Sequence, residues 1–144
     1  MVADAVLETV PRIMRRIRRA MRAGEGRDPG TTLPQLRALL FVRRKPGCSR
    51  STLAEHLGMT PPGCSGLVER LVRAGWLERT IDPDERRRVQ LGLTADGMEQ
   101  VAHANLRARA WLVQGLDDVS RHDLADLQAS LGLLERVTAE GERG

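Results

Sequence analysis

Three consecutive arginines, Arg86–Arg88, have the clearest capacity for chemistry in this chain of 144 residues. They follow the turn-forming sequence Asp82–Glu85 and precede the alternating segment Val89–Leu93. Together with the segment Trp76–Ile81, this pattern predicts a two-stranded ribbon that carries guanidinium groups near its tip. Guanidinium groups are attracted to narrow, A·T-rich minor grooves of DNA, so the ribbon favours nucleic-acid binding. The alternative interpretation of the arginine run is a solvated surface loop.

Two short helices joined by a tight turn are predicted immediately before the ribbon. Ser49 is a suitable N-cap for a helix that ends near Leu57, and Gly58 suits the left-handed backbone of the following turn. Thr60 is a second N-cap, followed by the helix Pro61 to about Ala74. The apolar face of that second helix is predicted to contain Cys64, Leu67, Val68 and Leu71. This order is typical of a winged helix-turn-helix, which places its second helix in the DNA major groove.

The candidate DNA-binding residues therefore come from the helix pair and from the ribbon. They are Ser49, Thr60, Pro62, Gly63, Ser65, Gly66, Arg70, Arg73, Arg86, Arg87 and Arg88. Near the start of the second helix only Ser65 has a hydrogen-bonding side chain. Backbone approach, contact with thymine methyl groups and DNA shape are accordingly expected to contribute much of the specificity.

Each cationic candidate has an expected role. Arg70 and Arg73, with Thr60, are expected to hold phosphates and fix the register on the duplex. Arg86 is expected to enter the minor groove. Arg87 is expected to pair with Glu85 or Asp84 and hold the ribbon rigid, and Arg88 suits either role.

The motifs LAEHLGMT, LVERLVRAGWLERT, DPDERR and LTADG resemble the MarR family of bacterial transcriptional regulators, over about residues 33 to 100. The resemblance implies a homodimer whose two winged domains bind a pseudo-palindromic operator, with the chain ends forming the dimer interface. The chain departs from the family pattern at three positions. Gly63 and Gly66 stand where many members have Thr or Ser and Arg, and Glu85 stands where Asp is usual.

The first helix is predicted from about Ala3 to Ala23. Pro11 lies within it, which predicts either a kink or a start near Thr9. A break rich in Gly and charge, Gly24 to Gly30, separates it from a helix over Pro34 to Arg44. After the ribbon, Thr94 is expected to cap a helix over about Ala95 to Gly115, whose apolar side is expected to contain Met98, Val101, Ala102, Leu106 and Val113.

A last helix is predicted after Ser120–Asp123, which has the sequence of a capping box. Apolar stripes on the first and last helices favour self-association, because the central domain is already complete without them. The candidate dimerisation residues are Val6, Val10, Ile13, Ile17, Leu124, Leu127, Leu131 and Leu134. The alternative is that both helices pack on their own domain.

We therefore predict a mainly α fold with a small β wing, in which a winged helix-turn-helix domain is flanked by N- and C-terminal dimerisation helices. The expected divisions are residues 1–32 for the N-terminal helix and linker, 33–97 for the DNA-binding domain and 98–144 for the C-terminal helices. The net charge is +4, but residues 1–45 contribute +7, residues 46–94 contribute +1 and residues 95–144 contribute −4. The basic surplus of the first segment either attracts phosphates or pairs with the acidic C-terminal segment.

Other chemistries have little support in the sequence. No apolar run approaches the length of a membrane span, no signal core opens the chain, and two cysteines make no disulfide framework, so we expect a cytoplasmic protein. The three histidines are scattered and no Cys-x-x-Cys occurs, so neither a metal nor another cofactor is expected. No nucleophile-base motif or phosphate loop is present, so an enzyme is not expected.

The leading hypothesis is a sequence-specific DNA-binding regulator, in particular a repressor, on a double-stranded operator. A small-molecule effector lodged between the terminal helices and the winged domain would lower its affinity. Two alternatives stay open. One is a winged-helix protein-interaction module without specific DNA binding, which the two glycines of the second helix make conceivable. The other is a regulator that senses oxidants through Cys48 or Cys64.

Overall fold

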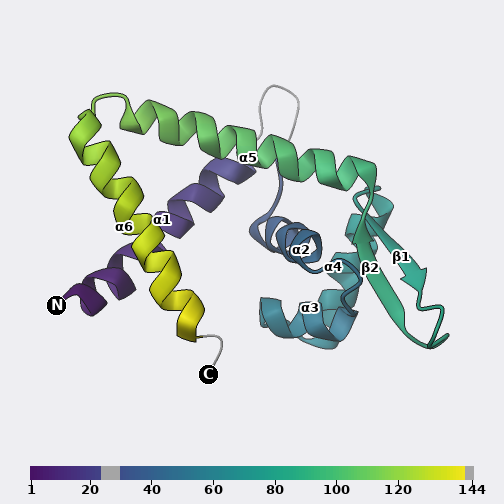
Figure 1. Cartoon of the computed structure of the whole chain (residues 1–144). Coiled ribbons are helices and arrows are strands. Elements are labelled where there is room, and N and C mark those ends of the chain that lie inside the picture. The colour runs from purple at the N-terminus through teal and green to yellow at the C-terminus, as the bar shows by residue number, and fades with distance from the viewer. Residues whose placement is uncertain (24–29, 142–144) are drawn as a thin grey trace. The chain divides into compact units, whose positions relative to one another are not determined.

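The computed structural model describes residues 1–23 and 30–141 and contains six helices and one two-stranded sheet in that part of the chain. The elements follow the order α1 (Val2–Arg22), α2 (Leu33–Arg44), α3 (Arg50–Leu57), α4 (Pro61–Arg73), β1 (Leu77–Ile81), β2 (Val89–Leu93), α5 (Ala95–Leu116) and α6 (Arg121–Gly141) (Figure 1). The fold class expected from the sequence, mainly helical with a small β wing, is confirmed. The chain divides into two compact units, Met1–Arg109 and Ala110–Gly144.

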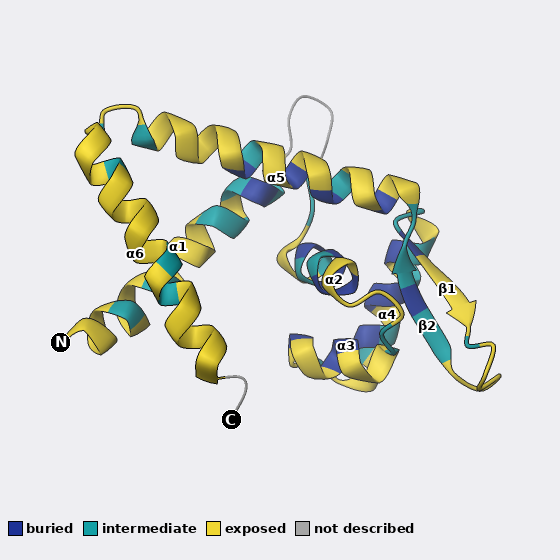
Figure 2. Cartoon of the chain, in the orientation of Figure 1, coloured by how far each residue is buried: buried dark blue, intermediate teal, exposed yellow. Residues whose placement is uncertain are grey.

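The core of the first unit is built from α2, α3, α4, the base of the sheet and the start of α5. In Figure 2 the buried residues of this core, in dark blue, lie on α2, α3, α4 and the strands. Fully buried leucines dominate it: Leu39, Leu53, Leu67, Leu71, Leu77 and Leu91. Burying each leucine contributes roughly 2 kcal/mol to folding, so this cluster fixes the positions of α3 and α4.

The sheet is one antiparallel hairpin that pairs Leu77 with Leu93 at its base and Ile81 with Val89 toward its tip. Only its base is buried, because Leu77 and Leu91 enter the core while Ile81 is exposed. The first strand begins at Leu77, one residue later than expected. The carbonyl of Trp76 instead accepts a hydrogen bond from the backbone N–H of Thr94 at 3.1 Å.

Helix α1 is continuous from Val2 to Arg22, with Pro11 in its interior, so the alternative start near Thr9 is wrong. Its C-terminal end packs on the first unit, where Met21 forms a buried cluster with Leu36, Ala104 and Ala108. The guanidinium of Arg107 on α5 donates to the carbonyl of Met21 at 2.7 and 3.0 Å, which anchors α1. The expected break at Gly24 to Gly30 lies outside the described residues except for Gly30.

The apolar side predicted for α5 is mostly exposed in the structure and is not the side that packs on the core. The buried residues of α5 are Gly97, Val101, Ala104 and Ala108, whereas Met98, Leu106 and Val113 are exposed. Small residues face the core because Met21 and Leu36 pack closely against this side of the helix. An exposed row of larger apolar side chains is left on α5.

Capping at two other helices agrees only in part with the prediction. At Ser120 the hydroxyl accepts from the backbone N–H of Asp123 at 3.0 Å and donates to its carboxylate at 2.8 Å, so the N-cap is confirmed. The full reciprocal capping box occurs at α2 instead. There the Thr32 side chain accepts from the Gln35 backbone while the Gln35 side chain accepts from the Thr32 backbone. This box was missed although its sequence follows the S/T-x-x-Q pattern.

Candidate nucleic-acid interface

The helix pair α3–α4 has the capping predicted from its sequence. The Ser49 hydroxyl accepts from the backbone N–H of Thr52 at 3.1 Å, and the Thr60 hydroxyl accepts from that of Gly63 at 3.3 Å. Between the helices, Gly58 has φ +66° and ψ +33°, a left-handed conformation that glycine adopts without steric cost. The two helices are therefore joined by a short turn with little freedom.

Helix α4 separates a buried side from an exposed side. Cys64, Leu67, Val68 and Leu71 are buried as predicted. On the other side Pro62 and Gly66 are exposed, and Gly63 and Ser65 are half-buried. No atom lies within 4 Å of a Cβ built on Gly66, so the surface there is open. The predicted base-facing residues thus lie together on the exposed side of the N-terminal half of α4.

The first turn of α4 offers few backbone donors. Pro61 and Pro62 have no N–H, the N–H of Gly63 is bonded to the Thr60 hydroxyl, and that of Cys64 is bonded to the Thr60 carbonyl at 2.9 Å. The anion-binding capacity of a helix N-terminus depends on free N–H groups. Hydrogen bonds from this end of α4 to DNA must therefore come from side chains.

Ser65 is not isolated. Its hydroxyl accepts a hydrogen bond at 3.4 Å from the Nη1 of Arg50, which lies in the first turn of α3. The thiol of Cys64 in turn contacts the carbonyl of Arg50 at 3.7 Å. Arg50 was missed by the sequence analysis, because a contact between residues 15 apart has no local signal.

The cationic candidates of α4 and the ribbon are all exposed: Arg70, Arg73, Arg86, Arg87 and Arg88. The ribbon tip is ordered by its backbone, since the Asp82 carboxylate accepts from the N–H of Asp84 at 2.9 Å and the Asp82 N–H donates to the Arg88 carbonyl at 2.9 Å. Within residues 30–141 no ion pair joins Arg87 to Glu85 or Asp84. The turn is held instead by the hydrogen bonds of Asp82.

An ion pair instead lies lower on the ribbon. The guanidinium of Arg79 on β1 donates to the carboxylate of Glu69 on α4, which ties the ribbon to α4. The sequence alone does not identify Arg79 as the partner of Glu69. A residue separation of ten gives no periodic signal in sequence.

The thiols do not have the properties of a redox sensor. Cys64 is buried and Cys48 half-buried, and burial raises the pKa of both thiols. A reactive cysteine requires a lowered pKa, so these environments disfavour the thiol-sensing alternative.

His56 stacks on Phe41 with ring centroids 4.3 Å apart. Burial, followed by the charge of Arg44, lowers the pKa of His56.

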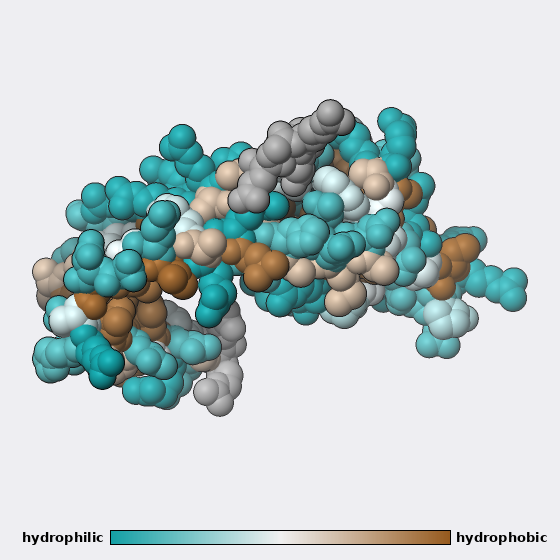
Figure 3. Space-filling view, turned by 90° about the horizontal axis from the view of Figure 1, so that it is seen from above, coloured by the Kyte–Doolittle hydropathy of each residue, from teal (hydrophilic) through white to brown (hydrophobic). Residues whose placement is uncertain are grey.

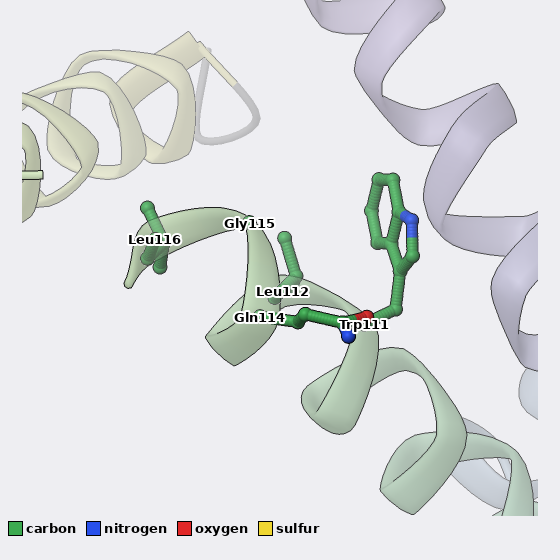
Figure 4. Close-up of a pocket in the computed structure, with 5 residues that line it drawn as sticks. All are labelled: Trp111, Leu112, Gln114, Gly115 and Leu116. Atoms are coloured by element: carbon green, nitrogen blue, oxygen red, sulfur yellow. The ribbon is translucent and has the colours of Figure 1, made fainter. Parts of the chain in front are cut away.

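Small hollows lie within each of the two units. One of 460 Å³ in the first unit is lined by Val10, Pro11, Met14, Arg15, Arg18, Arg22 and Leu33. Another, 360 Å³ in volume, is lined by residues at the end of α5, where the indole of Trp111 projects from the helix (Figure 4). The described residues contain no group of three or more His, Cys, Asp or Glu side chains that could hold a metal ion. None of the described helices is both long and apolar enough to span a bilayer.

The candidate dimerisation residues are unevenly covered within the chain. Ile17 packs beside the Met21 cluster, Val6 and Val10 are half-buried, and Ile13 is 44% exposed. On α6, Leu124 and Leu134 are half-buried, while Leu127 and Leu131 are 43% and 59% exposed.

Comparisons with known proteins agree with this geometry. The sequence pattern of the MarR family matches residues 30–88. The HTH-type transcriptional repressor Rv2887 of Mycobacterium tuberculosis is 31% identical over 81 residues, which cover 56% of this chain and 58% of that protein. A transcriptional regulator of Thermotoga maritima shares the fold with a TM-score of 0.83 at 23% identity, over 98% of this chain and 99% of that chain.

A structure solved with DNA also shares the fold. FabT of Streptococcus pneumoniae in complex with DNA has a TM-score of 0.66 at 18% identity, over 96% of this chain and 98% of that chain. Rv2887 is a transcriptional repressor, and the Thermotoga maritima protein is a transcriptional regulator.

Proposed function

We propose that the chain is a member of the MarR family of winged-helix transcriptional regulators, and that it is a cytoplasmic repressor that binds a pseudo-palindromic operator as a homodimer. The observation that supports this most directly is the exposed side of α4 beside a ribbon tipped with Arg86–Arg88. A helix enters the major groove and guanidinium groups suit the adjacent minor groove. In this proposal Ser49, Thr60, Arg70 and Arg73 hold phosphates and position the helix.

Fluorescence anisotropy with DNA from upstream of the protein's own gene tests the proposal. We expect saturable binding that survives an excess of random-sequence competitor, because specific sites bind roughly 10³-fold or more tightly than non-specific DNA. Equal, salt-labile binding to every sequence would support the protein-interaction alternative and contradict the regulator.

The dimer is supported by apolar side chains that the chain itself leaves exposed. No residue of α6 is buried among the described residues, and Leu127, Leu131, Leu133 and Val137 are each 43–59% exposed. Apolar side chains, drawn in brown, also reach the surface in Figure 3. Large exposed apolar surfaces are typical of interaction sites, and a second copy is the occupant that a palindromic operator requires.

Light scattering measures the mass of the protein in solution and so tests the oligomeric state. We expect about twice the chain mass of 15.9 kDa. The Leu131→Asp variant is expected to shift the protein toward monomer, because it places a charge in an apolar interface. The matched variant Ala125→Asp adds the same charge at an exposed position of α6 on another side of the helix from Leu131, and we expect it to remain a dimer. A wild-type protein of 15.9 kDa at all concentrations would exclude the dimer.

We place effector binding at the hollow of α1 and the start of α2. Its apolar floor, Val10, Pro11 and Met14, lies beside Arg15, Arg18 and Arg22, and the Nε of Arg22 is buried without a hydrogen-bond partner among the described atoms. This combination suits a small apolar acid. In the anisotropy assay, a small aromatic acid that releases the DNA supports this assignment. A panel of such acids that leaves both binding and melting unchanged excludes it.

A further inference from the structure

We infer that Arg50, a residue of α3 and not of the recognition helix, reads a base edge in the major groove and determines part of the operator specificity. The inference rests on the proposed DNA binding by α4. In this inference the Arg50 guanidinium supplies the hydrogen bonds that the N-terminal half of α4 lacks. The observation that carries it is the hydrogen bond between the guanidinium of Arg50 and the hydroxyl of Ser65.

The first step is the shortage of donors on α4 itself. Its first turn has no free N–H group among Pro61, Pro62 and Gly63, and Gly63 and Gly66 have no side chains. The Ser65 hydroxyl is then the only polar side-chain group on the exposed side before Glu69. A surface with one hydroxyl cannot distinguish four base pairs by direct hydrogen bonding, because each pair presents several donors and acceptors.

The second step is the position of the Arg50 guanidinium. Its Nη1 lies 3.4 Å from the Ser65 Oγ, which places the group beside the second turn of α4. That turn is within the half of a recognition helix that lies nearest the base edges. The absence of side chains at Gly63 and Gly66 lets α4 approach the DNA closely, and so brings the neighbouring guanidinium toward the groove.

The third step is how firmly Arg50 is held. The Ser49 cap fixes the start of α3, and the Arg50 carbonyl contacts the thiol of the buried Cys64. The side chain itself remains exposed and borders a hollow of 310 Å³ together with Pro61 and Ser65. One of the five guanidinium donors is directed to Ser65, so the remaining donors are available to a ligand. The backbone of Arg50 is therefore fixed, while the remaining N–H groups of its guanidinium can donate to a ligand.

The chemistry of the target follows from the donor group. A guanidinium with paired donors matches the O6 and N7 acceptors of guanine, which is the commonest specific arginine contact in the major groove. Lysine retains the charge but not the paired geometry. A residue that only held a phosphate would affect all sequences equally.

The test starts with the wild-type protein and selection of bound sites from a random DNA library. One site that contains a required G·C pair in each half-site is then compared with the same site carrying A·T there. Affinities are measured for wild type, Arg50→Lys, Arg50→Ala and Ser65→Ala, with Arg109→Ala, an exposed arginine of α5, as the control for lost charge. Circular dichroism checks that each variant melts like wild type.

We expect Arg50→Lys and Arg50→Ala to reduce the preference for the G·C site by at least about fivefold, with a smaller reduction in Ser65→Ala. Binding to random DNA should stay the same in Arg50→Lys. A uniform loss on all sequences in Arg50→Ala, with the preference unchanged at every position, would show a phosphate contact and overturn the inference alone. A wild-type protein that selects no sequence would overturn the proposed function and the inference together.

Discussion

Replacement of Gly97 by alanine is expected to destabilise the protein by about 3 kcal/mol, because no room exists for a side chain. A Cβ at this position would lie 2.0 Å from the carbonyl oxygen of Trp76 and 2.9 Å from its carbonyl carbon. Both are backbone atoms that cannot rotate away. Urea unfolding at fixed protein concentration measures the loss, and a fall in melting temperature of about 6–12 °C is expected for a chain of this size.

The reason lies in the junction between the ribbon and α5. The Thr94 hydroxyl donates to the Gly75 carbonyl and accepts from the N–H of Gly97 at 3.0 Å. The N–H of Trp76 donates to the Leu71 carbonyl at 3.0 Å, so the same junction is tied to α4. A side chain at Gly97 must push α5 away and disturb these bonds, and the base of the ribbon with them.

Gly115→Ala is the matched control, because Gly115 lies in the same helix and no atom is within 4 Å of a Cβ built there. Alanine should stabilise that position by up to about 1 kcal/mol through its higher helix propensity. If Gly97→Ala unfolded at the same urea concentration as wild type, the close approach of α5 to Trp76 would be wrong.

The parts of the fold that the sequence predicts well are those with local causes. The caps at Ser49 and Thr60 and the turn at Gly58 depend on residues within a few positions of each other, and the structure has them where expected. The hairpin follows equally from the turn residues after Ile81. These features position α4, so the exposed side of the recognition helix was predictable.

The face of α5 was not predictable from periodicity alone. Two stripes of helical spacing run along it, one through Met98 and Leu106 and one through Val101, Ala104 and Ala108. Hydrophobicity favours the first stripe, but the close packing of α1 and α2 selects the smaller side chains. The choice depends on a tertiary contact, and the same is true of the Arg50–Ser65 and Arg79–Glu69 pairs.

The Arg79–Glu69 pair changes the expected source of the ribbon's rigidity. The sequence predicts an ion pair within the ribbon tip, whereas in the structure Glu69 and Arg79 connect the side of the ribbon to α4. The three tip arginines have no ion pair among the described residues. Their charges are therefore available to DNA, and the ribbon can act together with the recognition helix.

Removal of all three tip charges, in the variant Arg86→Ala, Arg87→Ala and Arg88→Ala, is expected to weaken DNA binding by about 100-fold or more. Each subunit of a dimer would lose its minor-groove contact. The slope of log affinity against log salt should become shallower by about 0.9 for each phosphate contact that is lost. The melting temperature should change little, because the arginine side chains are exposed and the tip is held by the hydrogen bonds of the Asp82 carboxylate and of the Asp82 backbone N–H.

Anisotropy titrations across a range of salt concentrations measure both quantities. The matched control removes three exposed arginines elsewhere, in the variant Arg16→Ala, Arg19→Ala and Arg109→Ala, and so lowers the net charge equally. If long-range attraction by net charge dominated, the two variants would weaken binding to the same extent, and the ribbon would have no special role. If the ribbon enters the groove, only the tip variant loses most of its affinity for DNA. The single variant Arg86→Ala should then reproduce the larger part of that loss, because Arg86 is the residue assigned to the minor groove.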